Sequence, residues 1–313
     1  MGVRYVAMAT ALKLLSACPQ TRWFYGRLAH DIGREHLESI LRVSLYDSRL
    51  HMNRARELLE LVDRHNLIRN GNEVLELGTG WIHWESIVVR LFYDVRVTLF
   101  DICDSRQLAP LRRLLTEVPL ERIGEEWPSK SCYELERGPG ELRRAISSVE
   151  SFDELYRLLG FQYVVDQSGR LQVFEDGSFD VVFSVNVLEH VNRDILSEYI
   201  QDIYRVMRPG GYSFHKIDLT DHLYVYDRSV SPKNYLTYSD RMWKRYFENG
   251  LQYFNRVQRP EWLRLFQEAG LQLMREESGR VDIGRISVDK RYENLDVKDL
   301  ECGDLRLIYR KPL

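Results

Sequence analysis

The spacing of hydrophobic residues predicts helices in the first 70 residues. Residues 5–17 carry apolar side chains at helical intervals, at Tyr5, Met8, Leu12 and Leu15. A later helix begins at Asn53, a residue type that caps helix N-termini, and its apolar stripe consists of Ala55, Leu58, Leu59 and Val62. The polar run at 70–72 then breaks the chain. We therefore expect residues 1–70 to form an N-terminal helical cap.

The rest of the chain alternates short apolar segments, which suit strands, with segments of helical periodicity. Strands are expected at 73–77, 96–100, 161–165, 179–184, 212–217, 271–276 and 305–310. Helices are expected at 82–92, 192–207 and 261–269. Such alternation favours parallel strands with helices on both faces. We expect one α/β domain over 71–313, with a Rossmann-like seven-stranded sheet whose last strand is antiparallel.

Two segments interrupt this alternation and are expected to be insertions. Residues 105–160 hold helical stretches at 110–115 and 141–159, separated by the Gly-Pro-Gly sequence at 138–140. Residues 218–258 are polar and rich in aromatic side chains. The first is predicted to be a helical insertion and the second an aromatic one.

The first predicted strand ends in a glycine-rich turn, residues 76–80 (ELGTG). Glycine has no Cβ, so the backbone can approach a ligand closely. Ligands of open α/β sheets bind at the carboxyl ends of the strands. Asp101 ends the neighbouring strand, 21 residues after Gly80, where a carboxylate can accept both hydroxyls of a ribose. This pattern fits nicotinamide enzymes as well as methyltransferases.

The residues after the turn argue against a dinucleotide. His83 stands where the third glycine of the dinucleotide fingerprint belongs, and Trp81 adds further bulk. That glycine allows close packing beside a pyrophosphate. S-adenosylmethionine has no phosphate and does not need this clearance.

Three phrases resemble the class I S-adenosylmethionine-dependent methyltransferases. They are DGSFDVVFS at 176–184, VLEHV at 187–191 and RVMRPGG at 205–211. The resemblance covers residues 50–217 well and the C-terminal strands more loosely. It implies the methyltransferase fold and S-adenosylmethionine as cofactor.

The resemblance also implies roles for single residues. The methionine part of the cofactor would lie at Glu76, Gly78, Thr79 and Gly80, and its ribose and adenine at Asp101, Ile102 and Asp166. Ser184 and Asn186 would line the cofactor after the fourth strand. Structural alternatives stay open, in which Glu76 caps the turn, Asp101 caps a helix and the Glu189-His190 pair supports its loop.

Composition limits the partners and the location. The formal net charge is −3, with 44 Lys and Arg, so no nucleic-acid partner is expected. Cys18, Cys103, Cys132 and Cys302 form neither a zinc spacing nor a disulfide framework, which favours reduced thiols in the cytoplasm. The helix at 5–17 is too short and too interrupted to span a membrane, and it either packs as a cap or contacts a membrane surface.

Methyl transfer to a hydroxyl needs a group that removes its proton. His215, Asp218, Asp221 and His222 follow one another at the end of the fifth strand, where His215 is predicted to be the general base. An aspartate would orient its ring, and His222 belongs to the same catalytic group. A divalent metal that gathers acceptor hydroxyls, or a purely structural role, are the alternatives.

The region after this cluster resembles bacterial methyltransferases that are associated with glycan and sugar modification. The phrases are H-x-x-D-L-x-D-H from His215, SPKNYL at 231–236, YSDRMW at 238–243 and Asn255-Arg256. An aromatic surface with polar groups suits a sugar. The predicted substrate residues are Tyr224, Tyr235, Trp243, Asn255 and Arg256. A packed subdomain or a homodimer contact would use aromatic residues equally.

The leading hypothesis is therefore an O-methyltransferase that acts on a hydroxyl of a sugar, glycan or related small metabolite. An N- or C-methyltransferase acting on another small molecule is the first alternative. A methyltransferase-like binding protein without activity is the second, against which the intact glycine turn and Asp101 argue.

Overall fold

The computed structural model describes residues 2–17, 48–117 and 148–313. Part of the predicted N-terminal cap therefore lies outside the described residues. So do the Gly-Pro-Gly sequence at 138–140 and the first part of the helix expected at 141–159.

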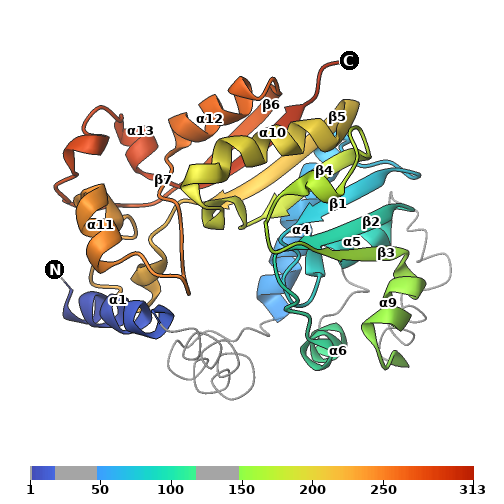
Figure 1. The fold of residues 1–313 in the computed structure, drawn as a ribbon, viewed down its shortest axis with the longest axis horizontal. Coiled ribbons are helices and arrows are strands. Elements are labelled where there is room, and N and C mark those ends of the chain that lie inside the picture. Colours follow the sequence, from blue (N-terminus) through green and yellow to red (C-terminus); the bar gives the residue numbers. More distant parts are fainter. Residues whose placement is uncertain (1, 18–47, 118–147) are drawn as a thin grey trace.

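A seven-stranded sheet forms the centre of the molecule, in the order β3-β2-β1-β4-β5-β7-β6 (Figure 1). The strands are β1 (Glu73–Leu77), β2 (Arg96–Asp101), β3 (Phe161–Val165), β4 (Phe179–Val185), β5 (Met207–Asp218), β6 (Gln272–Arg280) and β7 (Cys302–Arg310). The pairs among β1 to β5 are parallel, and β7 is antiparallel to both β5 and β6. The predicted α/β fold with its antiparallel last strand is confirmed. The strand order reverses between β1 and β4, which is where such sheets bind ligands.

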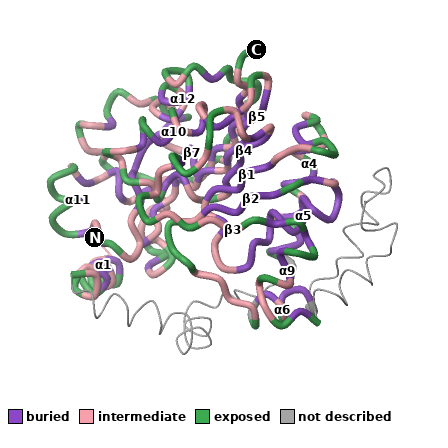
Figure 2. The backbone as a smooth tube through the Cα atoms, turned by 45° about the vertical axis from the view of Figure 1, so that its right-hand side comes forward, coloured by how far each residue is buried: buried purple, intermediate pink, exposed green. Residues whose placement is uncertain are grey.

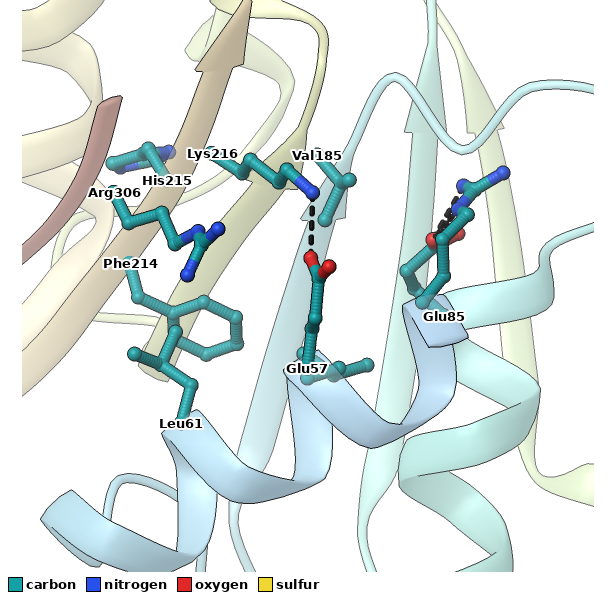
Figure 3. Close-up of a pocket in the computed structure, with 10 residues that line it drawn as sticks. Glu57, Leu61, Glu85, Val185, Phe214, His215, Lys216 and Arg306 are labelled. Carbon is teal, nitrogen blue, oxygen red and sulfur yellow. Dashed lines mark hydrogen bonds and ion pairs between the residues drawn. The ribbon is translucent and has the colours of Figure 1, made fainter. Parts of the chain in front are cut away.

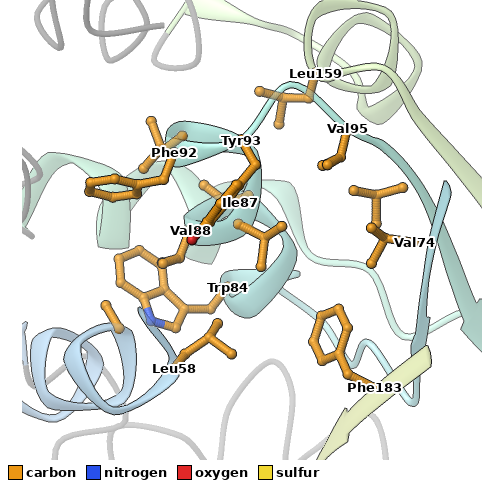
Figure 4. Packing of buried hydrophobic residues seen from close by; sticks show 14 of the residues in the cluster. Leu58, Val74, Trp84, Ile87, Val88, Phe92, Tyr93, Val95, Leu159 and Phe183 are labelled. Carbon is orange, nitrogen blue, oxygen red and sulfur yellow. The ribbon is translucent and has the colours of Figure 1, made fainter. Parts of the chain in front are cut away.

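Helices cover both faces of this sheet, as predicted. One face carries α4 (Ser48–His65) and α5 (Trp84–Phe92), and the other carries α10 (Leu196–Val206) and α12 (Arg259–Glu268) (Figure 1). Trp84 anchors the first core, where it packs with Leu58, Ile87 and Phe183 (Figure 4). Strands β1, β2, β4 and β7 are buried along most of their length, whereas the edge strands β3 and β6 are largely exposed or half-buried (Figure 2).

Several element boundaries differ from the prediction. Asn53 is not an N-cap, because α4 is already helical at Ser48 and Asn53 is exposed within it. Met207 continues the helical spacing of α10 but begins β5, since it pairs with Phe179. In the described part of 105–160, α6 (Leu108–Glu117) and α9 (Phe152–Leu159) are helical, and α9 begins at the N-cap Ser151.

A third apolar cluster lies beside the sheet, where α1 (Val3–Ser16) packs on the aromatic segment 218–258 and α11 (Asp240–Tyr246) (Figure 1). Tyr5, Ala9 and Leu12 are buried there, and the Tyr5 hydroxyl donates to the Asp221 carboxylate at 2.7 Å. The two described helices of residues 1–70 thus lie in different places, α1 on this segment and α4 on the sheet.

Short elements complete the described chain. They are α13 (Val297–Leu300) and the 3-10 turns η1 (Leu171–Val173), η2 (Leu188–His190), η3 (Arg193–Ile195), η4 (His222–Val225), η5 (Asn234–Thr237) and η6 (Lys290–Tyr292). Among the helices of the described ranges, none is long and apolar enough to cross a membrane. Contact with a membrane surface and a homodimer contact stay predictions.

Candidate active site

A pocket of about 430 Å³ opens at the carboxyl ends of β1, β2 and β4, where the strand order reverses. This volume lies in the range of small-molecule sites. Predicted cofactor residues on its wall are Gly78, Asp101, Ile102 and Asn186. Residues that were not predicted are Phe100, Gln167, Ser168, Gly169, Val187, His190, Val191, Asn192, Ile195 and Tyr199. The pocket therefore combines an apolar wall with a few polar groups.

The glycine turn adopts a backbone that other residues rarely take. Gly78 has a φ of +65°, and a Cβ on it would lie 2.5 Å from a methyl carbon of Val187. Gly80 has a φ of +63°, and its N–H donates to the Asp101 carboxylate at 3.0 Å. The missing side chain of Gly78 thus leaves room for the pocket wall, while Gly80 joins the turn to β2.

Asp101 presents its carboxylate to the pocket from the end of β2. Its second oxygen accepts the Ile102 N–H at 2.8 Å. Burial raises the pKa of Asp101, and the hydrogen bonds from Gly80 and Ile102 oppose this by favouring the ionised form.

Glu76 and Thr79 lie beneath the turn rather than on the pocket wall. The Glu76 carboxylate accepts hydrogen bonds from the hydroxyls of Thr79 and Ser86. Burial raises its pKa, which favours the neutral acid. The fully buried His83 contacts Thr79 Oγ1 at 2.7 Å and the Tyr156 hydroxyl at 2.9 Å. These contacts fix the turn from below, so the bulk of His83 lies in the core.

Asp166 and Ser184 are also placed behind the wall. Asp166 follows β3, and its Oδ1 accepts the Ser168 N–H at 2.8 Å, which shapes the turn that reaches the pocket at Gln167 to Gly169. Ser184 is fully buried, and its Oγ lies 2.8 Å from Nδ1 of His215.

The position predicted for His215 needs correction. The ring is 1% exposed, packs 5.2 Å from the Phe266 ring of α12 and does not line the cofactor pocket. Burial lowers the pKa of His215 to about 3, which keeps the ring neutral. Its neighbour Lys216 points to the opposite face and pairs with Glu57 of α4 at 2.6 Å (Figure 3). The strand ends further on, so His215 lies inside the sheet and not at its edge.

A different histidine stands at the pocket, together with two of the predicted catalytic residues. His190 lines the pocket, and its ring lies 4.9 Å from that of His222. Asp218 Oδ2 lies 3.7 Å from Nε2 of His222, and the Asp218 N–H donates to Glu189 Oε1 at 3.3 Å. We call Glu189, His190, Asp218 and His222 the His190 cluster. It brings the end of β5 to the loop that follows β4.

Electrostatics differ among the members of this cluster. Glu189 is buried, and desolvation raises its pKa to about 8. Burial and the neighbouring His190 lower the pKa of His222, which Asp218 partly opposes. The Nδ1 atom of His190 lies 2.6 Å from the backbone oxygen of Tyr253. A carbonyl oxygen only accepts, so Nδ1 carries the proton and Nε2 of the neutral ring is left as the basic atom.

A second cavity, of about 230 Å³, adjoins the pocket at Asn192, which lines both. Its wall holds Trp243, Tyr253 and Phe254, with Arg193, Asp194, Asp240, Lys244, Glu248, Asn255, Arg256 and Arg291. The predicted substrate residues Trp243, Asn255 and Arg256 thus share one cavity.

The polar groups of Asn255 and Arg256 already serve the fold. The Asn255 side-chain amide donates to the backbone oxygens of Leu188 and Val191. Arg256, with a φ of +59°, donates to two backbone oxygens of the aromatic segment and stacks 4.8 Å from Trp243. Both residues therefore position the walls of the second cavity.

Tyr235 and Tyr224 lie away from both cavities. The Tyr235 hydroxyl is buried and donates to the Leu219 backbone oxygen at 2.7 Å. Tyr224 stacks with Arg228 at 4.5 Å beside a third cavity near the N-terminus of α1. They therefore lie apart from the other three predicted substrate residues, and their role in binding an acceptor stays a prediction.

A family model described as a methyltransferase domain matches residues 48–276. No curated protein matches the sequence. Among solved structures, a Bacillus halodurans protein provisionally named a methyltransferase is 15% identical with a TM-score of 0.46, covering 83% of this chain and 99% of its own.

Two further structures are similar at the same level. A Galdieria sulphuraria protein provisionally named a sarcosine dimethylglycine methyltransferase is 13% identical, with a TM-score of 0.46 and coverage of 83% of this chain and 86% of its own. Phosphoethanolamine N-methyltransferase 2 of Haemonchus contortus, in complex with S-adenosyl-L-methionine, is 15% identical with a TM-score of 0.42. The match covers 82% of this chain and 53% of that protein.

The sheet order, the glycine turn and the pocket define a Rossmann-like methyltransferase domain. The match spans more than half of the chain, which therefore belongs to the methyltransferase-domain family. It is an S-adenosylmethionine-dependent methyltransferase, as the sequence motifs predicted.

Proposed function

We propose that this enzyme transfers the methyl group to a hydroxyl of a sugar, glycan or related small metabolite. The observation that carries the proposal is the position of His190, which stands at the pocket wall with its Nδ1 committed to the Tyr253 backbone oxygen. A hydroxyl, unlike an amine, must lose its proton to react, and an imidazole held at the pocket wall by its Nδ1 suits that task.

Residues at the carboxyl ends of neighbouring strands would hold the cofactor in the pocket. Gly78 leaves the clearance that a Cβ would fill, and Asp101 offers a carboxylate to a ribose. Phe100, Ile102 and Tyr199 supply apolar surface for the adenine. S-adenosylmethionine, when bound, supplies a methyl group activated by the positive charge of its sulfonium.

The acceptor would lie in the second cavity with its reactive hydroxyl toward His190. Asn192 joins the two cavities, and Tyr253 both lines the second cavity and holds His190. Tyr253, which is half-buried, provides a ring on which the apolar face of a sugar can stack, whereas Trp243 is 3% exposed and packs against Phe247 and Arg256. Arg193, Asp194 and Lys244 offer hydrogen bonds at the rim. Aromatic and polar groups in this proportion suit a hydroxylated acceptor.

The experiment is a transfer screen with cofactor labelled in its methyl group, against nucleotide sugars, glycan fragments and matched amines. We expect label in a hydroxylated acceptor and at least a 100-fold lower turnover in His190→Gln, as for loss of a general base. His65→Gln, at the end of α4 and away from the pocket, is the matched control. Label only in amines would contradict the proposal, as would a His190→Gln variant with wild-type turnover.

A further inference from the structure

We infer that Glu189, His190 and His222 bind a divalent transition-metal cation beside the cofactor pocket. Each of the three residues offers one ligand atom, and these atoms lie within 4.8 Å of one another. Ligands bound about 2 Å from one ion lie roughly 3–4 Å apart, so small side-chain adjustments bring them to bonding distance. The inference keeps the hydroxylated acceptor of the proposed function, on which it rests, and replaces the general-base role of His190 by metal binding.

An unpartnered buried atom gives independent support. Glu189 is 2% exposed, and its Oε2 has no hydrogen-bond partner in the described part of the chain. A buried carboxylate oxygen without a partner is costly, and buried charges are usually paired or bind metals. The other oxygen, Oε1, accepts the Asp218 N–H. A cation between the imidazoles would supply the missing partner of Oε2.

The surroundings orient the three ligands as metal sites require. Histidine ligands commonly use their second nitrogen to bind a carbonyl or carboxylate, which fixes the ring. His190 does this through Nδ1 and the Tyr253 backbone oxygen, which leaves Nε2 for the ion. Asp218 Oδ2 lies 3.7 Å from His222 Nε2, which is an ion-pair distance and longer than a hydrogen bond. The Asn255 N–H donates to the Glu189 backbone oxygen at 2.8 Å and holds the loop in place.

The ligand set selects the kind of ion. Two imidazoles and one carboxylate suit Zn²⁺, Fe²⁺ or Co²⁺, whereas Mg²⁺ prefers oxygen ligands only. Three protein ligands leave a coordination position open. Since Glu189 is buried and His190 is exposed on the pocket wall, the open position faces the cofactor pocket. We assign that position to the acceptor hydroxyl.

The ion would lower the pKa of the hydroxyl, as it does for bound water. The hydroxyl proton passes to solvent. The acceptor oxygen then forms a bond to the methyl carbon while the sulfur–methyl bond breaks, and the electron pair of that bond stays on sulfur. The products are the methyl ether and the neutral thioether of the cofactor, so atoms and charge balance.

The first test measures metal binding without any acceptor. The purified full chain, stripped with a chelator, is titrated with Co²⁺ alone, and the visible absorption of the ion reports its nitrogen and oxygen ligands. We expect one equivalent bound, with at least 10-fold weaker affinity in His190→Asn and in Glu189→Gln. His65→Asn is the control and should bind as wild type. Circular dichroism and denaturant unfolding show that each variant is folded.

The outcomes separate this inference from the proposed function. Absence of stoichiometric Co²⁺ binding, or equal affinity in the wild type and both cluster variants, overturns the metal site. If hydroxyl methylation then persists in the presence of chelator, the proposed function stands with His190 as the base. If Co²⁺ binds at the cluster while only amines are methylated, the metal site stands and the proposed acceptor fails.

Discussion

The Nδ1 atom of His190 lies 2.6 Å from the backbone oxygen of Tyr253, 63 residues further along the chain. Two residues later, the side chain of Asn255 donates to the backbone oxygens of Leu188 and Val191. The segment 253–255 therefore fixes both ends of the short turn that carries Glu189 and His190. This arrangement ties the aromatic segment to the cofactor pocket.

Replacing Asn255 by Ala should loosen that turn. Asn255 is 5% exposed, and the change removes three hydrogen bonds: the Val191 oxygen and the Val257 N–H lose their partner, while the Leu188 oxygen keeps the Val191 N–H. We expect the free energy of unfolding to fall by about 2–3 kcal/mol, at about 1 kcal/mol for each unmade bond. Denaturant unfolding measures it. The control is Asn53→Ala, since Asn53 is exposed and accepts one bond from Arg56. An equal loss of unfolding free energy in both variants would show that the hydrogen bonds of Asn255 do not stabilise the turn.

Replacing Asp101 by Ala should weaken cofactor binding. Asp101 lines the pocket, and hydrogen bonds to a charged group contribute about 1.5–3 kcal/mol. The dissociation constant for S-adenosylmethionine, measured by calorimetry, should rise roughly 10- to 100-fold. Asp104→Ala is the matched control, because Asp104 is exposed, pairs with Arg106 and does not line the pocket. Unchanged affinity in Asp101→Ala would remove Asp101 from the proposed ribose site.

The fold could be predicted from local patterns because the sheet is built from them. The apolar run at 179–184 required a strand covered on both faces, and it lies at the centre of the sheet. The prediction that Met207 ends a helix was wrong. Met207 follows Ile203 at helical spacing, but its pairing with Phe179 makes it the first residue of β5. That pairing joins residues 28 positions apart, which no window of sequence contains.

The site could be predicted only in part, for a related reason. His215 and Ile217 alternate with Lys216 along β5, and both pack in the core under α12. The sequence did not show that α12 covers this face. The VLEHV phrase drew attention to His190, but its orientation depends on the Tyr253 backbone oxygen. A backbone atom that distant carries no signal in the side-chain pattern.

Replacing Gly78 by Ala should lower the free energy of unfolding by more than the positive φ of this residue alone explains. The added Cβ would lie 2.5 Å from a methyl carbon of Val187, so side chain or turn must shift. Gly71→Ala is the matched control, with a φ of +85° and no atom within 4 Å of the new Cβ. A left-handed residue costs about 1–2 kcal/mol in either place, and overpacking adds about 1–3 kcal/mol at Gly78.

Denaturant unfolding of both variants measures that difference, and calorimetry should show loss of cofactor affinity in Gly78→Ala only. The double variant Gly78→Ala/Val187→Ala should recover part of the stability, because the smaller side chain removes the clash. If Gly71→Ala lowers the free energy of unfolding as much as Gly78→Ala does, the close approach of Val187 does not affect stability.

Lys233 should make the free energy of unfolding depend on pH in the neutral to alkaline range. Its side chain is fully buried, and its ammonium donates to Gln258 Oε1 at 2.9 Å and to the Cys302 backbone oxygen at 2.8 Å. Burial lowers the pKa of Lys233 from 10.5 to about 7. Between these values the unfolded chain binds the proton and the folded chain does not. The free energy of unfolding therefore rises with pH across this window. The stabilisation is fully present above pH 10.5 and is lost as the pH falls to about 7, the pKa of Lys233 in the folded chain.

Lys233→Met keeps the length of the side chain and removes the proton. The stability of the wild type relative to this variant should increase between pH 7 and pH 10.5 by up to about 5 kcal/mol, since one pKa unit corresponds to about 1.4 kcal/mol. Guanidinium unfolding at several pH values measures the difference, in which the titration of all other groups cancels. At pH 7 the variant still leaves the Gln258 and Cys302 acceptors unpaired, so the two proteins need not be equal there. Parallel curves for the two proteins would mean that Lys233 keeps an ordinary pKa in the folded state.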